Sequence, residues 1–187
     1  MSLPILLDIP MPIVTDHLLI RESRAGEGRA INEAVAESFT ELHRWMPWAK
    51  SMPSVEESES FSRETAAKFL TRKDFGLRVW SPDGQRLWGA AGLHPQNWDA
   101  RSFEIGYWIR TSEAGKGLMT EAVVALTAYA FKHLDAGRIQ IRCDSGNTAS
   151  RRVAEKSGYV LEGTHRRDCV NNEGTLRDTC VYARLRD

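Results

Sequence analysis

Hydrophobic and polar residues in the N-terminal part of the chain recur with the period of helices. Residues 30–42 carry apolar side chains three or four positions apart, so one face of a helix there would be buried. The segment WMPW (residues 45–48) breaks this pattern because proline cannot continue a helix. Ser54 and Glu57 then form a capping-box pattern, which predicts a second helix to about Leu70.

After residue 70 the pattern changes to short runs of β-branched and aromatic residues separated by turn residues. Between two of these runs, Pro82 and Gly84 predict a tight turn, since proline fixes φ and glycine accepts a positive φ. Residues 171–174 (NNEG) predict a second hairpin turn. Strands are expected at residues 17–21, 76–80, 86–93, 102–110, 138–143, about 159–170 and about 175–185.

Two more helices are predicted among these strands. Residues 118–134 form a long amphipathic pattern, and Gly137 follows where a helix would end. A shorter helix begins at Asn147 and ends at Gly158. The order of elements indicates a mixed α/β sheet in one domain over residues 1–187, a length that suits a single hydrophobic core.

Charge argues against one class of partner. Lys+Arg and Asp+Glu both number 25, so the formal net charge is zero. No global positive field is available to attract nucleic acid, although a local basic patch stays open. We therefore expect no nucleic-acid partner.

The spacing of the cysteines and the prolines near the N-terminus indicate the cellular compartment. The cysteines form no C-x-x-C pair and no metal-ligand spacing with histidine, so we expect no metal site and a reducing environment. The apolar N-terminal segment has no basic start, is interrupted by prolines, and is too short to span a bilayer. We expect a cytoplasmic protein without a membrane partner. The residues concerned are Cys143, Cys169, Cys180, Pro4, Pro10 and Pro12.

The segment from Glu104 to Val123 has the form of an anion-binding site. A strand runs through a glycine-bearing turn into a helix, whose first amides are unpaired and point outward. The helix dipole adds positive potential there, so a pyrophosphate fits. Gly115 and Gly117 would let the backbone approach phosphates, and Lys116 adds a charge. An ordinary glycine turn before a core helix is the alternative, and the P-loop pattern is absent.

A second segment, residues 147–163, would place another helix beside the first. Asn147 is a good N-cap and Gly158 a good C-cap, and capping alone explains both residue types. The strand-to-helix junction also follows soon after the phosphate-binding helix. It would set two helices at the ends of neighbouring strands, where open α/β sheets bind ligands.

These two segments, in this order and spacing, resemble the acetyl-CoA-binding signature of the GNAT superfamily of N-acetyltransferases. Its R/Q-x-x-G-x-G/A turn corresponds to residues 114–119 (AGKGLM), where Gly117 matches the central glycine and Ala114 and Met119 depart from the pattern. Rim-type members, which acetylate protein N-termini, are similar to this chain at TDHLLIR, WMPWA, GYW, N-x-x-S, KSGYVLEG and VYARL. The resemblance implies the GNAT fold, a single mixed, mostly antiparallel central sheet flanked by helices.

The resemblance also implies acetyl-CoA as the acetyl donor. The strand near Trp108 would pair its backbone with the pantetheine arm, Asn147 would hydrogen-bond that arm, and the turn amides would hold the pyrophosphate. The basic residues of the second helix would either reach the adenosine phosphates or form a solvated helix face. The donor-binding residues are then Trp108, Ile109, Arg110, Ala114, Gly115, Lys116, Gly117, Leu118, Met119, Thr120, Asn147, Ser150, Arg151, Arg152 and Lys156.

The same resemblance places Ser150 beside the thioester sulfur, where its hydroxyl would protonate the departing thiolate. Glu104 is the candidate base on the central strand, or else a charge on the strand face. Relatives can carry an acidic residue where this chain has Cys169, and neighbouring strand residues face opposite ways, so Asp168 and water are the other candidates. Cys143 is either an acyl-carrying nucleophile or a small buried residue, and direct attack in GNAT enzymes favours the second.

The acceptor is expected to be a primary amine. An α-amine has a pKa of roughly 8 and a lysine one of about 10.4, so the α-amine of a protein N-terminus needs less help to lose its proton. A lysine side chain, a small amine or antibiotic, and a non-catalytic acetyl-CoA-binding domain are the alternatives. The sequence is compatible with a homodimer. Residues expected on the acceptor side, or else in the core or a dimer contact, are Trp45, Trp48, His94 and Trp98, with Met46 and Pro47.

Overall fold

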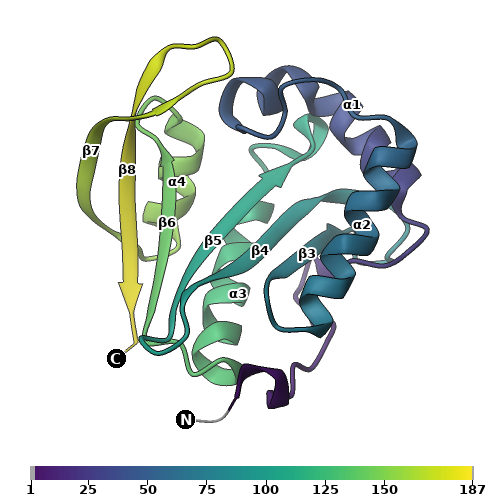
Figure 1. Cartoon of the computed structure of the whole chain (residues 1–187), viewed down its shortest axis with the longest axis horizontal. Coiled ribbons are helices and arrows are strands. Elements are labelled where there is room, and N and C mark those ends of the chain that lie inside the picture. Colours follow the sequence, from purple (N-terminus) through teal and green to yellow (C-terminus); the bar gives the residue numbers. More distant parts are fainter. Residues whose placement is uncertain (1–2, 187) are drawn as a thin grey trace.

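Eight strands form one sheet in residues 3–186, the part of the chain that the computed structural model describes (Figure 1). Their order is β1-β2-β3-β4-β5-β6-β8-β7, and only the β5–β6 pair among these described strands is parallel. The implied mixed, mostly antiparallel sheet is confirmed. The strands are β1 (Ile13–Val14), β2 (Leu19–Glu22), β3 (Phe75–Trp80), β4 (Leu87–Asn97), β5 (Ser102–Ile109), β6 (Arg138–Asp144), β7 (Val160–Val170) and β8 (Leu176–Leu185).

Within residues 3–186, four α-helices and two short 3₁₀ turns accompany these strands. All four predicted helices are confirmed, and the short elements β1, η1 and η2 were not foreseen. None of the helices described within residues 3–186 is both long and apolar enough to cross a membrane. The helices are α1 (Gly28–Trp45), α2 (Val55–Leu70), α3 (Leu118–His133) and α4 (Thr148–Lys156), and the 3₁₀ turns are η1 (Pro4–Leu6) and η2 (Thr111–Glu113).

Local sequence signals explain where α1 and α2 end and begin. α1 stops at Trp45 because Met46 takes an extended conformation ahead of Pro47. At α2, the Glu57 amide donates to the Ser54 hydroxyl at 3.1 Å and the Ser54 amide donates to the Glu57 carboxylate at 2.7 Å. Both halves of the predicted capping box are therefore present.

The helices lie on both faces of the sheet. In Figure 1, α3 and α4 lie behind the strands, and α2 lies in front of the β3 end. The main core joins α3 to the strands through fully buried side chains, whereas a smaller core joins α1 to the ends of β3 and β4. The central members of the main core are Leu77, Phe103, Ile105, Ala122, Leu126 and Ile139.

The two central strands separate partway along their length. β5 and β6 pair only at their first residues, Ser102 with Arg138, Phe103 with Ile139 and Glu104 with Gln140. Past these pairs β5 continues against β4, and β6 continues against β8. The strands therefore open into a V, which leaves the facing edges of both strands free of a strand partner among the described residues.

Candidate active site

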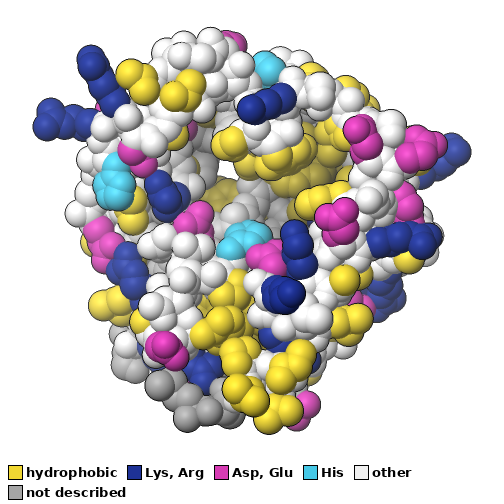
Figure 2. Space-filling model, in the orientation of Figure 1, with side chains coloured by type: hydrophobic (Ala, Val, Ile, Leu, Met, Phe, Trp, Pro, Cys, Tyr) yellow, Lys and Arg dark blue, Asp and Glu magenta, His cyan; other side chains and the backbone are white. Residues whose placement is uncertain are grey.

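A pocket of about 340 Å³ occupies the opening between β5 and β6. The space-filling view shows a hollow near the centre of this face, with hydrophobic side chains along its wall (Figure 2). The two strands, the start of α4, the end of α1 and the β7–β8 loop all contribute residues to it. Among the lining residues are Trp45, Met46, Pro47, Glu104, Gly106, Tyr107, Ile141, Cys143, Asp144, Asn147, Ser150, Cys169, Asn172 and Thr179.

The turn before α3 has the backbone that an anion site requires. Gly115 and Gly117 have φ values of +78° and +83°, a left-handed conformation that side chains with a Cβ rarely adopt. No atom lies within 4 Å of the Cβ position that either glycine lacks, so the space beside the turn is open. Within residues 3–186, none of the amides of residues 115–120 donates a hydrogen bond to the protein. The turn thus presents free amides at the positive end of a helix.

The side chains around this turn contact the protein itself and support the conformation of the turn. Lys116 Nζ lies 2.7 Å from the Glu113 carboxylate, so its charge is already paired beside the turn. Leu118 and Met119 have buried side chains, which explains why an apolar residue is tolerated in place of the usual small one. Ala114 follows η2 in an extended conformation. The contribution of this segment to an anion site is therefore carried by the backbone.

Arg110 is a structural residue. Its amide donates to the Trp88 carbonyl at 2.6 Å, and its guanidinium binds the Leu87 carbonyl and the Glu37 carboxylate. Neither group is free to pair with a pantetheine arm, which corrects the expectation for Arg110. Trp108 and Ile109 are the last residues of β5. The edge of β5 on the β6 side lacks a strand partner there, as a strand that binds pantetheine through its backbone requires.

On the opposite side of the pocket, α4 begins with a tight cluster of polar groups. Asn147 Oδ1 accepts a hydrogen bond from the Ser150 amide at 3.0 Å, so the predicted N-cap is confirmed. The Ser150 hydroxyl lies 2.9 Å from the Tyr107 hydroxyl, which also donates to the Ser150 carbonyl oxygen at 3.1 Å. This arrangement fixes the position of the Ser150 hydroxyl at the pocket wall.

Burial controls the protonation of the groups beside Ser150. It raises the pKa of the Tyr107 phenol above its usual range and the pKa of the Cys143 thiol to about 11, and a hydrogen bond with Ser150 opposes the shift in both. Both groups stay protonated at neutral pH. A thiol that holds its proton is a poor nucleophile, so the structure favours the interpretation of Cys143 as a buried residue of the pocket wall.

The basic residues of α4 do not act alike. Arg151 Nε donates to the Tyr182 hydroxyl at 3.2 Å and an Arg151 guanidinium nitrogen contacts the Ser145 carbonyl, so Arg151 is directed toward the sheet. Arg152 and Lys156 are exposed, and their places in α4 put them one turn apart. Of the three, these two are the ones available to an adenosine phosphate.

The carboxylates proposed as bases are in different places. Glu104 lines the pocket, and one of its oxygens accepts a hydrogen bond from Gln140 at 2.9 Å. Asp168 is paired with Arg142 at 3.0 Å, and a Thr179 hydrogen bond together with the Arg142 and His165 charges holds its pKa below its usual range. Cys169 lines the pocket in place of Asp168. The strand is irregular between His165 and Cys169, and Asp168 still contacts Arg142 and Thr179 of the pocket wall, so it is the ion pair with Arg142 that makes this carboxylate less available as a base.

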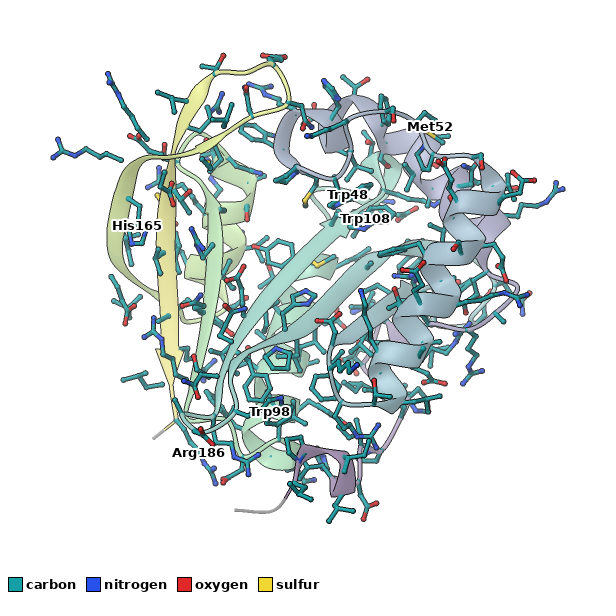
Figure 3. The ribbon with its side chains drawn as sticks, in the orientation of Figure 1. Trp48, Met52, Trp98, Trp108, His165 and Arg186 are labelled. Atoms are coloured by element: carbon teal, nitrogen blue, oxygen red, sulfur yellow. The ribbon has the colours of Figure 1, made fainter. Side chains whose placement is uncertain are left out.

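The aromatic residues expected on the acceptor side are divided between two ends of the molecule. Trp45 lines the pocket, and Trp48 packs on Trp108 with 6.4 Å between ring centres. Trp98 lies at the opposite end of the β4–β5 hairpin (Figure 3), where it packs edge-on against Phe103 at 5.1 Å and also against Phe75. For Trp98 the structure favours the core alternative over the acceptor side, because the hairpin carries it away from the opening and against the main core.

Tyr107, Asp144 and Arg177 were not foreseen as parts of the site. The sequence contains Tyr107 within GYW, but only the tertiary contact with Ser150 indicates its role. Asp144 pairs with Arg177 at 2.7 Å, and both line the pocket. No cluster of three or more metal-ligating side chains occurs among residues 3–186.

Comparisons with known proteins agree with this geometry. The Acetyltransferase (GNAT) domain family matches residues 17–160. YdaF of Bacillus subtilis (strain 168), provisionally named a ribosomal N-acetyltransferase, is 30% identical over 92% of this chain and 93% of its own length. The ribosomal-protein-serine acetyltransferase of Escherichia coli (strain K12) is 26% identical over 76% of this chain and 80% of its own length.

Among solved structures, the ribosomal L7/L12 alpha-N-protein acetyltransferase RimL in complex with coenzyme A superposes with a TM-score of 0.85 at 22% identity. The superposition covers 93% of this chain and 96% of RimL, so the two share the fold over almost their entire lengths. The sequence match to the domain family extends from β2 to α4, which includes the opened strands, the turn before α3 and Ser150. The chain is therefore a member of the GNAT family of acetyl-CoA-dependent N-acetyltransferases.

Proposed function

We propose that this N-acetyltransferase acetylates the α-amino group of a protein N-terminus. The observation that carries the proposal is that a single pocket reaches both the Ser150 hydroxyl and the Glu104 carboxylate. A neutral amine attacks the thioester carbonyl, the carbon–sulfur bond breaks, the attacking nitrogen loses one proton and keeps the other as the amide N–H, and the thiolate gains a proton. The site therefore needs a hydrogen-bond donor for sulfur and an anionic group for the ammonium, and these two residues supply them.

The turn before α3 does not line the pocket itself, and we assign it, with the β5 edge and α4, to the donor side, where acetyl-CoA supplies the activated acetyl group. The free amides of the turn before α3 would hold its pyrophosphate, and Arg152 and Lys156 would face the adenosine phosphates. The open edge of β5 would pair with the pantetheine arm as an added strand does. Ser150 would then donate to the departing sulfur. Tyr107, which keeps its proton, would orient the Ser150 hydroxyl without releasing a proton itself.

Two considerations support an α-amine as the acceptor. The relatives named above are described as modifying ribosomal proteins, and RimL as an alpha-N-protein acetyltransferase. The Asp168 carboxylate is also paired with Arg142 rather than free to act as a base, and an α-amine with a pKa of roughly 8 needs less assistance than a lysine of about 10.4. An acceptor that is a newly made protein would meet the enzyme in the cytoplasm. A homodimer stays a prediction.

A peptide that offers both kinds of amine tests the acceptor. The substrate carries a free α-amine and an internal lysine, and its control is the same peptide with a blocked N-terminus. We expect mass spectrometry to place acetyl on the α-amine, and thiol release to fall at least about 10-fold with the blocked peptide at pH 7, since lysine is almost wholly charged there. Acetyl mainly on lysine, or only on a small polyamine in a parallel reaction, would contradict the N-terminal assignment and leave the transferase assignment in place.

A further inference from the structure

A row of three glycines crosses the sheet beside the pocket. Gly76 on β3, Gly92 on β4 and Gly106 on β5 face one another in register, and Gly106 lines the pocket. The imidazole of His94 lies over this row of glycines. A Cβ placed on Gly92 would be 3.0 Å from His94 Nε2, and one placed on Gly106 would be 3.2 Å from the same atom. The missing side chains therefore leave room for the ring to extend toward the pocket.

The other ring nitrogen of His94 is held by Asp74. His94 Nδ1 lies 2.5 Å from the Asp74 carboxylate, which approaches from the segment ahead of β3. A carboxylate at Nδ1 keeps the proton on that nitrogen, so in the neutral ring Nε2 is the proton-accepting atom. Asp74 thus gives the ring a fixed orientation, with its basic nitrogen on the Gly106 side.

Glu104 lies between His94 and the pocket. It is the residue directly opposite His94 in the β4–β5 register, and it lines the pocket itself. Among the described residues, the charged groups acting on His94 are Asp74 and Glu104. Burial lowers the pKa of His94, but the Asp74 hydrogen bond and the two carboxylate charges outweigh burial and raise it above its ordinary value.

Resting on the proposed acetyl transfer to an ammonium acceptor, we propose that Asp74, His94 and Glu104 form a proton exit from the acceptor pocket to solvent. Glu104 holds the ammonium at the pocket end, His94 Nε2 takes the proton that the ammonium must lose, and Asp74 stabilises the imidazolium. The His94 side chain is 40% exposed, so it can return the proton to water. His94 is a positioning residue in this scheme, because it acts on the amine through Glu104 or through a water molecule.

The proton balance is complete along this path. The acceptor enters as an ammonium and loses one proton through His94 before attack. When the amide forms, the nitrogen loses a second proton and the CoA thiolate takes up one. The net reaction therefore releases one proton from an ammonium acceptor, and this released proton is the one that the exit carries.

The pH profile of acetyl transfer tests the exit. His94 accepts a proton only above its pKa, so the wild-type rate should rise as pH passes through that raised value. In His94→Gln we expect kcat/KM to fall roughly 10–100-fold near pH 6.5–7, with the deficit shrinking above pH 8, where an α-amine is already neutral. The matched control is His17→Gln, because His17 also contacts a carboxylate through Nδ1, that of Glu121 at 3.0 Å, but it precedes β2 and, unlike His94, does not stand opposite a pocket-lining residue such as Glu104.

A second measurement does not depend on turnover. In an NMR titration of the free protein, the pKa of His94 should lie above its ordinary value and should fall in Asp74→Asn and in Glu104→Gln, since each removes a charge that raises it. Three results would each contradict the proposed proton exit. The rate of His94→Gln could be unchanged, or it could fall by the same factor at every pH. The pKa of His94 could also stay the same in Glu104→Gln. Acetyl transfer to lysine or to a small amine would contradict only the proposal of an N-terminal acceptor. The proton exit would still apply, because those ammonium groups must lose a proton too.

Discussion

The position of a single hydroxyl determines what Ser150 can do. Its oxygen lies 2.9 Å from Tyr107, and its amide is held at 3.0 Å by Asn147. Because burial keeps the Tyr107 phenol protonated, tyrosine is a poor source of a proton for sulfur. Tyr107 therefore serves Ser150 by restricting its hydroxyl, which lowers the entropy lost when that hydroxyl turns toward the thiolate.

Paired variants separate these two roles. Ser150→Ala should lower kcat by roughly 10²–10⁴ with little change in acetyl-CoA affinity, because the donor for sulfur is lost. Tyr107→Phe should lower kcat only about 5–10-fold, the effect of one orienting hydrogen bond. The double variant should be no slower than Ser150→Ala, because without the Ser150 hydroxyl the side chain at position 107 has nothing to orient. Steady-state kinetics decide this, and multiplicative losses in the double variant would give Tyr107 a separate function.

At the scale of elements, the start of α3 depends on two glycines rather than on charged side chains. Lys116 is paired with Glu113, so removal of its charge should matter less than distortion of the turn. Gly117 is the N-cap of α3 with φ +83°, and the amides that follow it are free. A left-handed residue with a Cβ costs about 1–2 kcal/mol, which would be relieved by rotating these amides away from the phosphates.

Gly117→Val should therefore weaken acetyl-CoA binding by about 10-fold or more in calorimetry. The control is Gly26→Val, which shares the positive φ and the open space but precedes α1. It should destabilise the protein by a similar amount and leave the affinity unchanged. Equal affinities in wild type and Gly117→Val, with both proteins folded, would remove the turn from the donor site.

Elements whose determinants are local were predictable from sequence. The Ser54 capping box, the Asn147 cap and the glycine turn before α3 each depend on residues within one helical turn, and the structure contains all three. Roles that depend on contacts between distant segments were not predictable. Arg110 is bound to Glu37 on α1, and Trp98 is packed into the core by the direction of its hairpin. Neither contact is encoded in the residues next to these positions.

At the scale of the whole molecule, the pocket is closed by parts of the chain that are far apart in sequence. The β7–β8 loop reaches across the opening to the end of α1, where the Asn172 amide nitrogen donates to the His43 carbonyl at 2.7 Å and to the Met46 carbonyl at 3.0 Å. Trp45 and Asn172 both line the pocket. These bonds hold the end of α1 and the β7–β8 loop, the proposed acceptor rim, at a fixed separation, while the turn before α3 is proposed to serve the donor and does not line the pocket.

Asn172→Ala should consequently affect the acceptor and spare the donor. Loss of hydrogen bonds worth about 0.5–1.5 kcal/mol each would free the loop, so the KM for an acceptor peptide should rise about 5–10-fold, with the acetyl-CoA dissociation constant unchanged. Glu173→Ala is the matched control, because this exposed neighbour lies on the same turn and does not line the pocket. Its kinetics should match those of wild type. If Asn172→Ala weakened acetyl-CoA binding as much as peptide binding, the loop would be supporting the fold of the whole pocket rather than the acceptor rim.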